Sequence, residues 1–244
     1  MCRPYVLLLL AFTGFATAYT SFDNSYTLAN NVTIYRDTYG VPHIYGPTDE
    51  SVVFGFAWAQ CEDNFENLED NYIRAIGRAA EVQGEEAFLD DRIVHAMEIV
   101  KYSKQEYEKS SPKLKSLFNS FADGLNYYVS KNKNLKPKLI QKFEPWFPIA
   151  MLRYKYHKNE FLGYAGVGNK DIQQFFNTGM EKSSGSNAWA ISGNKTTSGN
   201  SMLLINPHVG FFGYGLYTEA HLHSEEGWNF SGVSRFGFPF PYMG

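Results

Sequence analysis

The chain has 244 residues, of which 22 are lysine or arginine and 25 are aspartate or glutamate, giving a formal net charge of −3. This near balance, without a basic stripe carrying interleaved aromatic residues, argues against a nucleic-acid partner. Aromatic residues make up 17% of the chain, which suits a large core and an apolar binding pocket equally well. The length is sufficient for one large domain or two small ones.

Residues 1–18 have the features of a secretory signal peptide. Arg3 precedes an apolar run that is too short to span a bilayer, and Ala16-Thr17-Ala18 ends the segment. We expect cleavage after Ala18, a secreted or periplasmic location and no membrane span. The alternative is a buried N-terminal helix. Cleavage would remove Cys2 and leave Cys61 as the only thiol, which excludes an intrachain disulfide.

The segment that follows predicts a hairpin and then helices. Residues 31–46 predict two short strands around Asp37-Thr38-Tyr39-Gly40. Arg36, Asp37 and His43 could form a catalytic constellation there, but a structural hairpin is the favoured interpretation. From Thr48 the pattern becomes helical, and Thr48 or Asp49 can serve as the cap.

Further helices are predicted over residues 90–109, from Pro112 to about residue 128, and from Pro148. The first of the predicted helices also carries a group of acidic residues. We expect these to form a solvated helix face rather than a metal site, because they match no calcium ligand set. They are Glu62, Asp63, Glu66, Glu69 and Asp70.

Beyond residue 162 the chain becomes rich in Gly, Asn, Lys and Ser and then turns abruptly to strand. Residues 187–191 and 202–206 are apolar runs joined by turn-forming residues, so they should pair as a hairpin. Gly185 directly precedes this hairpin, and its missing side chain permits backbone angles that are otherwise unfavourable. The pairing would bring His208 back towards Ser186.

Strands are also predicted over residues 216–224 and 228–234. Thr218, Ala220 and Leu222 alternate with the residues between them, which is the period of a half-buried strand. His221 and His223 therefore point the same way. We interpret them as part of a strand face rather than a zinc site, because a third ligand is missing from the pattern.

Three stretches together resemble one protein family. Gly185-Ser186-Asn187-Ala188-Trp189, followed by a hairpin and Asn206-Pro207-His208, resembles the penicillin amidase family of N-terminal-nucleophile hydrolases, and most of all its branch of acyl-homoserine-lactone and aculeacin acylases. The segments 36–44 and 144–148 also resemble family motifs, so the resemblance runs from Arg36 to Gly244.

The resemblance implies an α+β fold, namely an incomplete αββα sandwich with a mostly helical α-chain region. In these terms residues 19–162 are the α-chain region, 163–185 a spacer and 186–244 the start of a β chain. The family's oxyanion-hole donors would lie beyond Gly244. The resemblance therefore implies a fragment, a truncated gene product or half of a split enzyme.

The same resemblance implies roles for individual residues. The Gly185–Ser186 bond would be cut autocatalytically, and the freed α-amine, with a pKa of about 7.7–8.0, would act as base for the Ser186 hydroxyl. His208 lies where the family carries a histidine or glutamine beside the nucleophile. Val209 and Tyr242 lie where it often has acyl-pocket side chains. No cofactor and no metal ion is implied.

The implied activity is that of a secreted amidohydrolase cleaving the linear amide of N-acylated small molecules, such as β-lactam antibiotics, acyl-homoserine lactones or lipopeptides. The expected partners are the acyl amide substrate and the remainder of the β chain. The alternative is a catalytically inactive fragment, or a non-catalytic secreted module that binds acylated ligands or a partner chain.

Overall fold

The computed structural model describes residues 24–157, 185–210 and 213–244. The predicted signal peptide, and all of the predicted spacer except Gly185, lie outside these residues. Within them, no helix has both the length and the apolar character needed to cross a membrane.

The described strands form a four-stranded sheet and a separate two-stranded sheet. The larger sheet has the order β1-β2-β5-β6, in which β2 and β5 are parallel and the other neighbours antiparallel. Thr218, Ala220 and Leu222 are buried, which confirms the predicted alternation. The strands are β1 (Thr33–Arg36), β2 (Pro42–Gly46), β5 (Tyr217–Ser224) and β6 (Asn229–Arg235).

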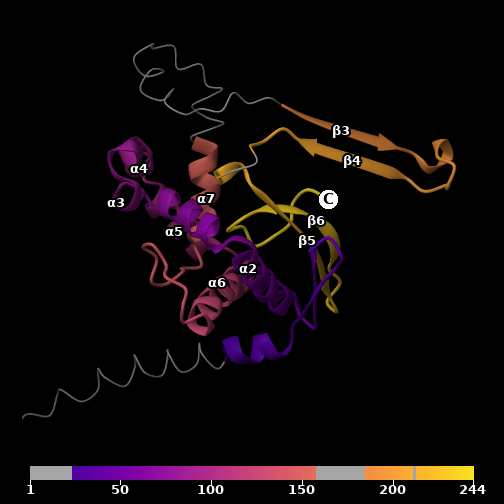
Figure 1. Ribbon diagram of the computed structural model, residues 1–244, viewed down its shortest axis with the longest axis horizontal. Coiled ribbons are helices and arrows are strands. Elements are labelled where there is room, and N and C mark those ends of the chain that lie inside the picture. The colour runs from indigo at the N-terminus through magenta and orange to yellow at the C-terminus, as the bar shows by residue number, and fades with distance from the viewer. Residues whose placement is uncertain (1–23, 158–184, 211–212) are drawn as a thin grey trace, which may run out of the picture.

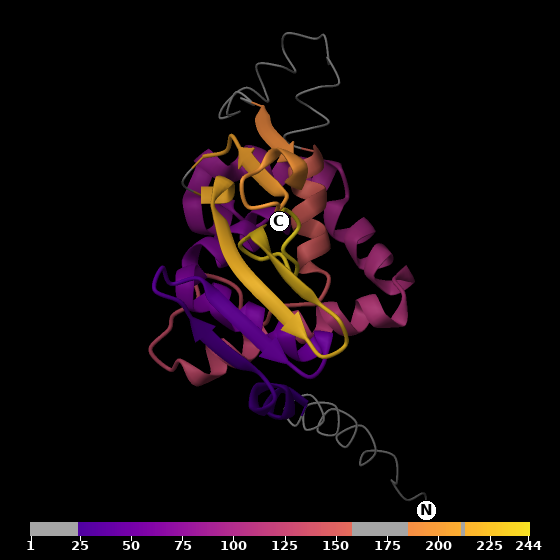
Figure 2. The ribbon, with the colours of Figure 1, turned by 90° about the vertical axis from the view of Figure 1, so that its right-hand side faces the viewer.

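The long helix α2 (Asp49–Ala75) covers one face of this sheet, as Figure 2 shows. It begins where the sequence predicts, because Thr48 and Ser51 form a reciprocal capping box with the backbone amides. The helix α6 (Pro112–Lys131) begins with its proline at the first helical position and packs across α2. The core lies between these two helices and the sheet.

The remaining helices correct one prediction. Residues 90–109 are not a single helix: α4 (Phe88–Ala96) ends before Glu98, whose φ is +48°, and α5 (Ile99–Lys109) begins after it. Val94 and Ile99 are both fully buried, yet in one straight helix they would point about 140° apart. The break allows both to reach the core. The short α3 (Ala80–Gln83) precedes α4, and α7 (Phe147–Lys155) packs against α5.

The two-stranded sheet consists of β3 (Ser186–Ile191) and β4 (Met202–Pro207), and it confirms the predicted hairpin. It does not join the four-stranded sheet but projects away from the body (Figure 1). Every residue of β3 is exposed, and so is every residue of β4 before Pro207. Leu203 and Leu204 are 60% and 48% exposed, so both faces of the hairpin present apolar side chains.

One acidic residue of α2 is not on a solvated face. Glu69 is only 1% exposed, and its carboxylate accepts hydrogen bonds from the backbone N–H groups of residues 138, 139 and 140. The prediction that this residue is solvated is therefore wrong. Three donors from a distant loop replace the water that the carboxylate would otherwise bind.

Three polar side chains of α2 hold the loop that follows β6. The buried Gln60 accepts from the Gly237 N–H at 2.8 Å and donates to the Phe238 carbonyl at 3.0 Å. Asn71 donates to the Phe236 carbonyl, and the Tyr72 hydroxyl donates to the Gly237 carbonyl. These bonds fix the C-terminal part of the chain on the N-terminal helix layer.

Candidate functional site

The candidate site begins at the Gly185–Ser186 bond, where β3 starts. Gly185 has a φ of +76°, and a Cβ added to it would meet nothing within 4 Å. The need for glycine therefore comes from the backbone conformation rather than from crowding. The backbone N–H of His208 donates to the Gly185 carbonyl at 3.3 Å. Since Ser186 pairs with Pro207, the hairpin register brings Gly185, Ser186 and His208 together as predicted from the sequence.

Two asparagines position the side chain of His208. Its Nε2 atom lies 3.0 Å from the Asn187 amide nitrogen and 3.4 Å from that of Asn206, and these two asparagines are register partners. With both amides oriented as donors, Nε2 is the acceptor of both hydrogen bonds. The sequence motifs contain both asparagines, but their spacing alone assigned them no role.

Val209 and Tyr242 lie on different parts of the fold. Val209 is half-buried and follows His208 directly. Tyr242 lies beside β6, where its N–H donates to the Val233 carbonyl at 3.1 Å and its hydroxyl donates to Tyr217 at 3.3 Å. Burial raises the pKa of Tyr242 well above the usual range. The residue as a whole is 42% exposed.

Arg235, which the sequence analysis did not single out, lies next to Tyr217 and Tyr242. Arg235 is 5% exposed, and its guanidinium carbon lies 4.8 Å from the centre of the Tyr217 ring. The only sequence signal that could have marked Arg235 is that it ends β6 directly before the aromatic segment of residues 236–242.

The favoured structural interpretation of the first hairpin agrees with its contacts. Arg36 forms ion pairs with Glu62 at 3.0 Å and Asp63 at 2.8 Å, which ties β1 to α2. The Asp37 carboxylate accepts from the backbone N–H groups of Tyr39 and Val41 within the turn. Desolvation acts to raise the pKa of Asp37, but these backbone donors together with His43 outweigh it and the pKa is lowered.

Comparison with known proteins places these features in context. Residues 31–244 match the family model described as penicillin amidase. The acyl-homoserine lactone acylase QuiP of Pseudomonas fluorescens is 30% identical over 110 residues, which is 45% of this chain and 14% of the relative. The penicillin acylase 2 proenzyme of a Pseudomonas species is 24% identical over 273 residues, covering 88% of this chain and 35% of the relative.

Among solved structures, a penicillin G acylase from Alcaligenes faecalis is similar, with 18% identity and a TM-score of 0.46 over 59% of this chain and 78% of that one. The chain spans between 14% and 35% of the length of the two curated relatives above. Because the family model covers most of the sequence, this chain belongs to the penicillin amidase family.

Proposed function

We propose that this chain is part of a secreted acylase that cuts itself at Gly185–Ser186 and then hydrolyses linear amides through Ser186. The hydrogen bond from the His208 N–H to the Gly185 carbonyl carries the proposal, because it places a donor on the bond to be cut. The relatives named as acylases support the same reaction class.

In the self-cleavage step the Ser186 hydroxyl oxygen attacks the Gly185 carbonyl carbon. The bond from that carbon to the Ser186 nitrogen breaks, the nitrogen takes up the hydroxyl proton, and an ester joins the two residues. Water then hydrolyses the ester, leaving a carboxylate on Gly185 and a free amine on Ser186. The His208 N–H stabilises the negative charge that develops on the Gly185 oxygen. Residues 19–162 would form the α-chain region, 163–185 the spacer and 186–244 the start of the β chain.

In amide hydrolysis the freed amine accepts the proton of its own hydroxyl. The Ser186 oxygen attacks the substrate carbonyl, the amine product leaves with that proton, and water releases the carboxylic acid from the acyl-enzyme. Asn187 and Asn206 hold His208 beside the nucleophile. Val209 and Tyr242 contact the acyl group. The substrates are N-acylated small molecules such as β-lactam antibiotics, acyl-homoserine lactones or lipopeptides.

The proposal also includes a partner, namely the remaining strands of the β chain. The exposed apolar faces of β3 and β4 suit the packing of further β-chain strands. Those strands would also carry the donors for the substrate oxyanion, each of which contributes roughly 3–4 kcal/mol to catalysis.

The first test is the intact mass of the purified chain. We expect two fragments that meet at Gly185–Ser186 in the wild type, an uncut chain in Ser186→Ala, and normal cutting in Ser192→Ala, which changes another exposed serine of the same hairpin. Cutting at this bond in Ser186→Ala would refute self-cleavage. So would an uncut wild-type chain both alone and with the remaining β chain.

The exposed hairpin also favours the second candidate, a non-catalytic module that binds acylated ligands. Turnover and binding separate the two functions. Labelled acyl amides that bind and are never hydrolysed, alone or with the remaining β chain, would favour the binding module.

A further inference from the structure

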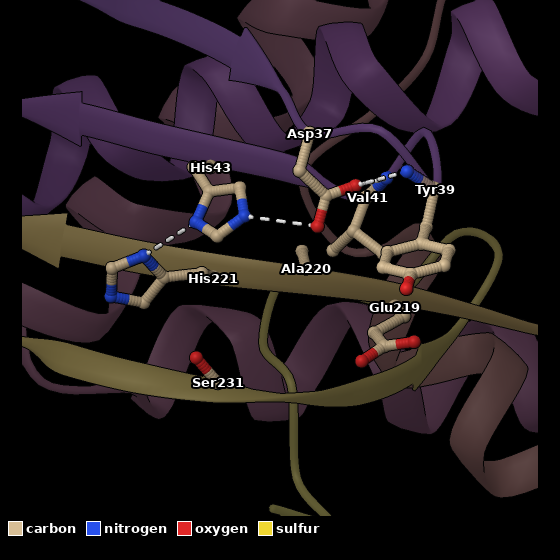
Figure 3. A pocket seen from close by; sticks show the side chains of 8 residues that line it. All are labelled: Asp37, Tyr39, Val41, His43, Glu219, Ala220, His221 and Ser231. Carbon is tan, nitrogen blue, oxygen red and sulfur yellow. Dashed lines mark hydrogen bonds and ion pairs between the residues drawn. The ribbon is translucent and has the colours of Figure 1, made fainter.

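The sheet face that α2 does not cover carries a second group of functional side chains. A cavity of about 400 Å³ lies there, bordered by the β1–β2 turn and by β5 and β6. Figure 3 shows the side chains that line it. His43 on β2 and His221 on β5 are register partners in the parallel pair of strands. Their rings meet edge to face with centroids 5.2 Å apart, and their Nδ1 atoms are separated by 3.1 Å.

The other ring nitrogens of this pair point away from each other, each towards an oxygen acceptor. The His43 Nε2 lies 3.5 Å from an Asp37 carboxylate oxygen, and the His221 Nε2 lies 2.8 Å from the Asn229 amide oxygen. Both acceptors can take a proton from Nε2, and the two Nδ1 atoms face each other at hydrogen-bond distance, as the dashed line in Figure 3 marks. A metal ion held by both Nδ1 atoms would replace the proton between them. Histidines that bind metal ions have this outer support, because a carboxylate or carbonyl on the distal N–H fixes the ring.

We propose that His43 and His221 together bind a divalent transition-metal ion of the zinc and copper class through their Nδ1 atoms. Imidazole nitrogen is a favoured ligand of these ions. With metal–nitrogen bonds of about 2.05 Å, the observed separation of 3.1 Å gives an angle of about 98° at the ion. A tetrahedral angle needs a separation of about 3.4 Å, which a small opening of the pair would provide.

This site is open rather than closed. In the described ranges no three His, Cys, Asp or Glu side chains are grouped to share an ion, so this pair, like His221 with His223, lacks a third protein ligand. What distinguishes His43 and His221 is that their Nδ1 atoms face each other at 3.1 Å, and the proposal assigns the remaining positions on the ion to water. The His43 side chain is 29% exposed, so an ion can reach it. Because β2 precedes Ser186 and β5 follows it, the bound ion would link the two parts of the chain on either side of that residue. Metal binding at His43 and His221 does not require the proposed activity of Ser186.

The test is calorimetric titration of the metal-free full chain with Zn²⁺ near neutral pH in a buffer that does not bind metal. We expect one ion per chain in the wild type and at least tenfold weaker binding in His43→Asn and in His221→Asn. His223→Asn is the matched control, since His223 lies two residues along the same strand face and outside the pair. Asp37→Asn should weaken binding between tenfold and a hundredfold.

A second measurement guards against misfolded variants. Zn²⁺ should raise the melting temperature of the wild type and of His223→Asn, but not that of His43→Asn, while the far-ultraviolet circular dichroism of all three agrees without the ion. Equal affinity in the wild type and both pair variants would place the ion elsewhere and overturn the proposal. Absence of saturable binding to the wild type would overturn it as well.

Discussion

Replacing Gln60 with methionine tests the contact between the N-terminal helix layer and the C-terminal loop. Methionine has a similar length and volume, so the change removes hydrogen bonding without opening a large cavity. The Gly237 N–H and the Phe238 carbonyl would each lose the partner that Gln60 supplies. The side chain is 0% exposed, so water cannot take over directly.

The expected loss follows from these two groups. A buried donor or acceptor left unpaired costs about 1–3 kcal/mol, so the loss of both partners should lower the free energy of unfolding of Gln60→Met by about 2–6 kcal/mol. For a chain of this size each kcal/mol corresponds to about 2–4 °C. The melting temperature should therefore fall by roughly 4–24 °C.

Urea unfolding followed by circular dichroism measures this loss. Gln105→Met on α5 is the control, because it makes the same chemical change at an exposed position and should change stability by less than about 0.5 kcal/mol. A loss in Gln60→Met no larger than in the control would show that the two backbone groups find other partners. The role assigned to Gln60 in holding the loop after β6 would then be wrong.

Three further changes have defined outcomes. Burial raises the pKa of Asp123 to about 6, above its ordinary value, so the folded state binds the proton more tightly and stability falls as pH rises from about 4 to 6. Asp123→Asn should remove this slope in urea titrations and raise stability at pH 7 by about 1–2 kcal/mol; an unchanged slope would contradict the assignment. Gly124→Ala would place a Cβ 2.6 Å from the Phe54 carbonyl oxygen and 2.7 Å from the Ala57 Cβ, so thermal unfolding should show a loss of about 1–3 kcal/mol, and an equally stable variant would refute close packing of α2 on α6. Glu69→Leu should cost about 3–6 kcal/mol in chemical unfolding because three backbone N–H groups lose their acceptor; a loss below 1 kcal/mol would mean that water reaches them.

Local signals account for the parts of the fold that the sequence predicts. Thr48 and Pro112 mark helix starts through chemistry that is complete within one turn. The turn-rich segment between β3 and β4 likewise fixes that hairpin and brings His208 to Gly185. The break at Glu98 was missed because nothing within the segment shows that both flanking apolar groups must reach the same core.

The features that were missed depend on residues far apart in the chain. Glu69 looks like any acidic helix residue until a loop about seventy positions later supplies its three donors. His43 and His221 are separated by 178 positions and meet only because β2 and β5 are parallel neighbours. No periodicity within either strand carries that information. The pairing of His221 with His43, rather than with His223, is therefore a product of topology.

The parallel pairing of β2 with β5 also has a consequence for folding. β2 and β5 are separated by more than 150 residues of chain, so their pairing is expected to form slowly during folding. The covalent connection between them keeps the two strands at a high effective concentration. If the chain is cut at Gly185–Ser186 as proposed, the same contact becomes an association between two polypeptides. In that case a cut molecule that has lost its fold would regain it at a rate that depends on protein concentration, whereas the uncut chain would refold at a rate independent of concentration.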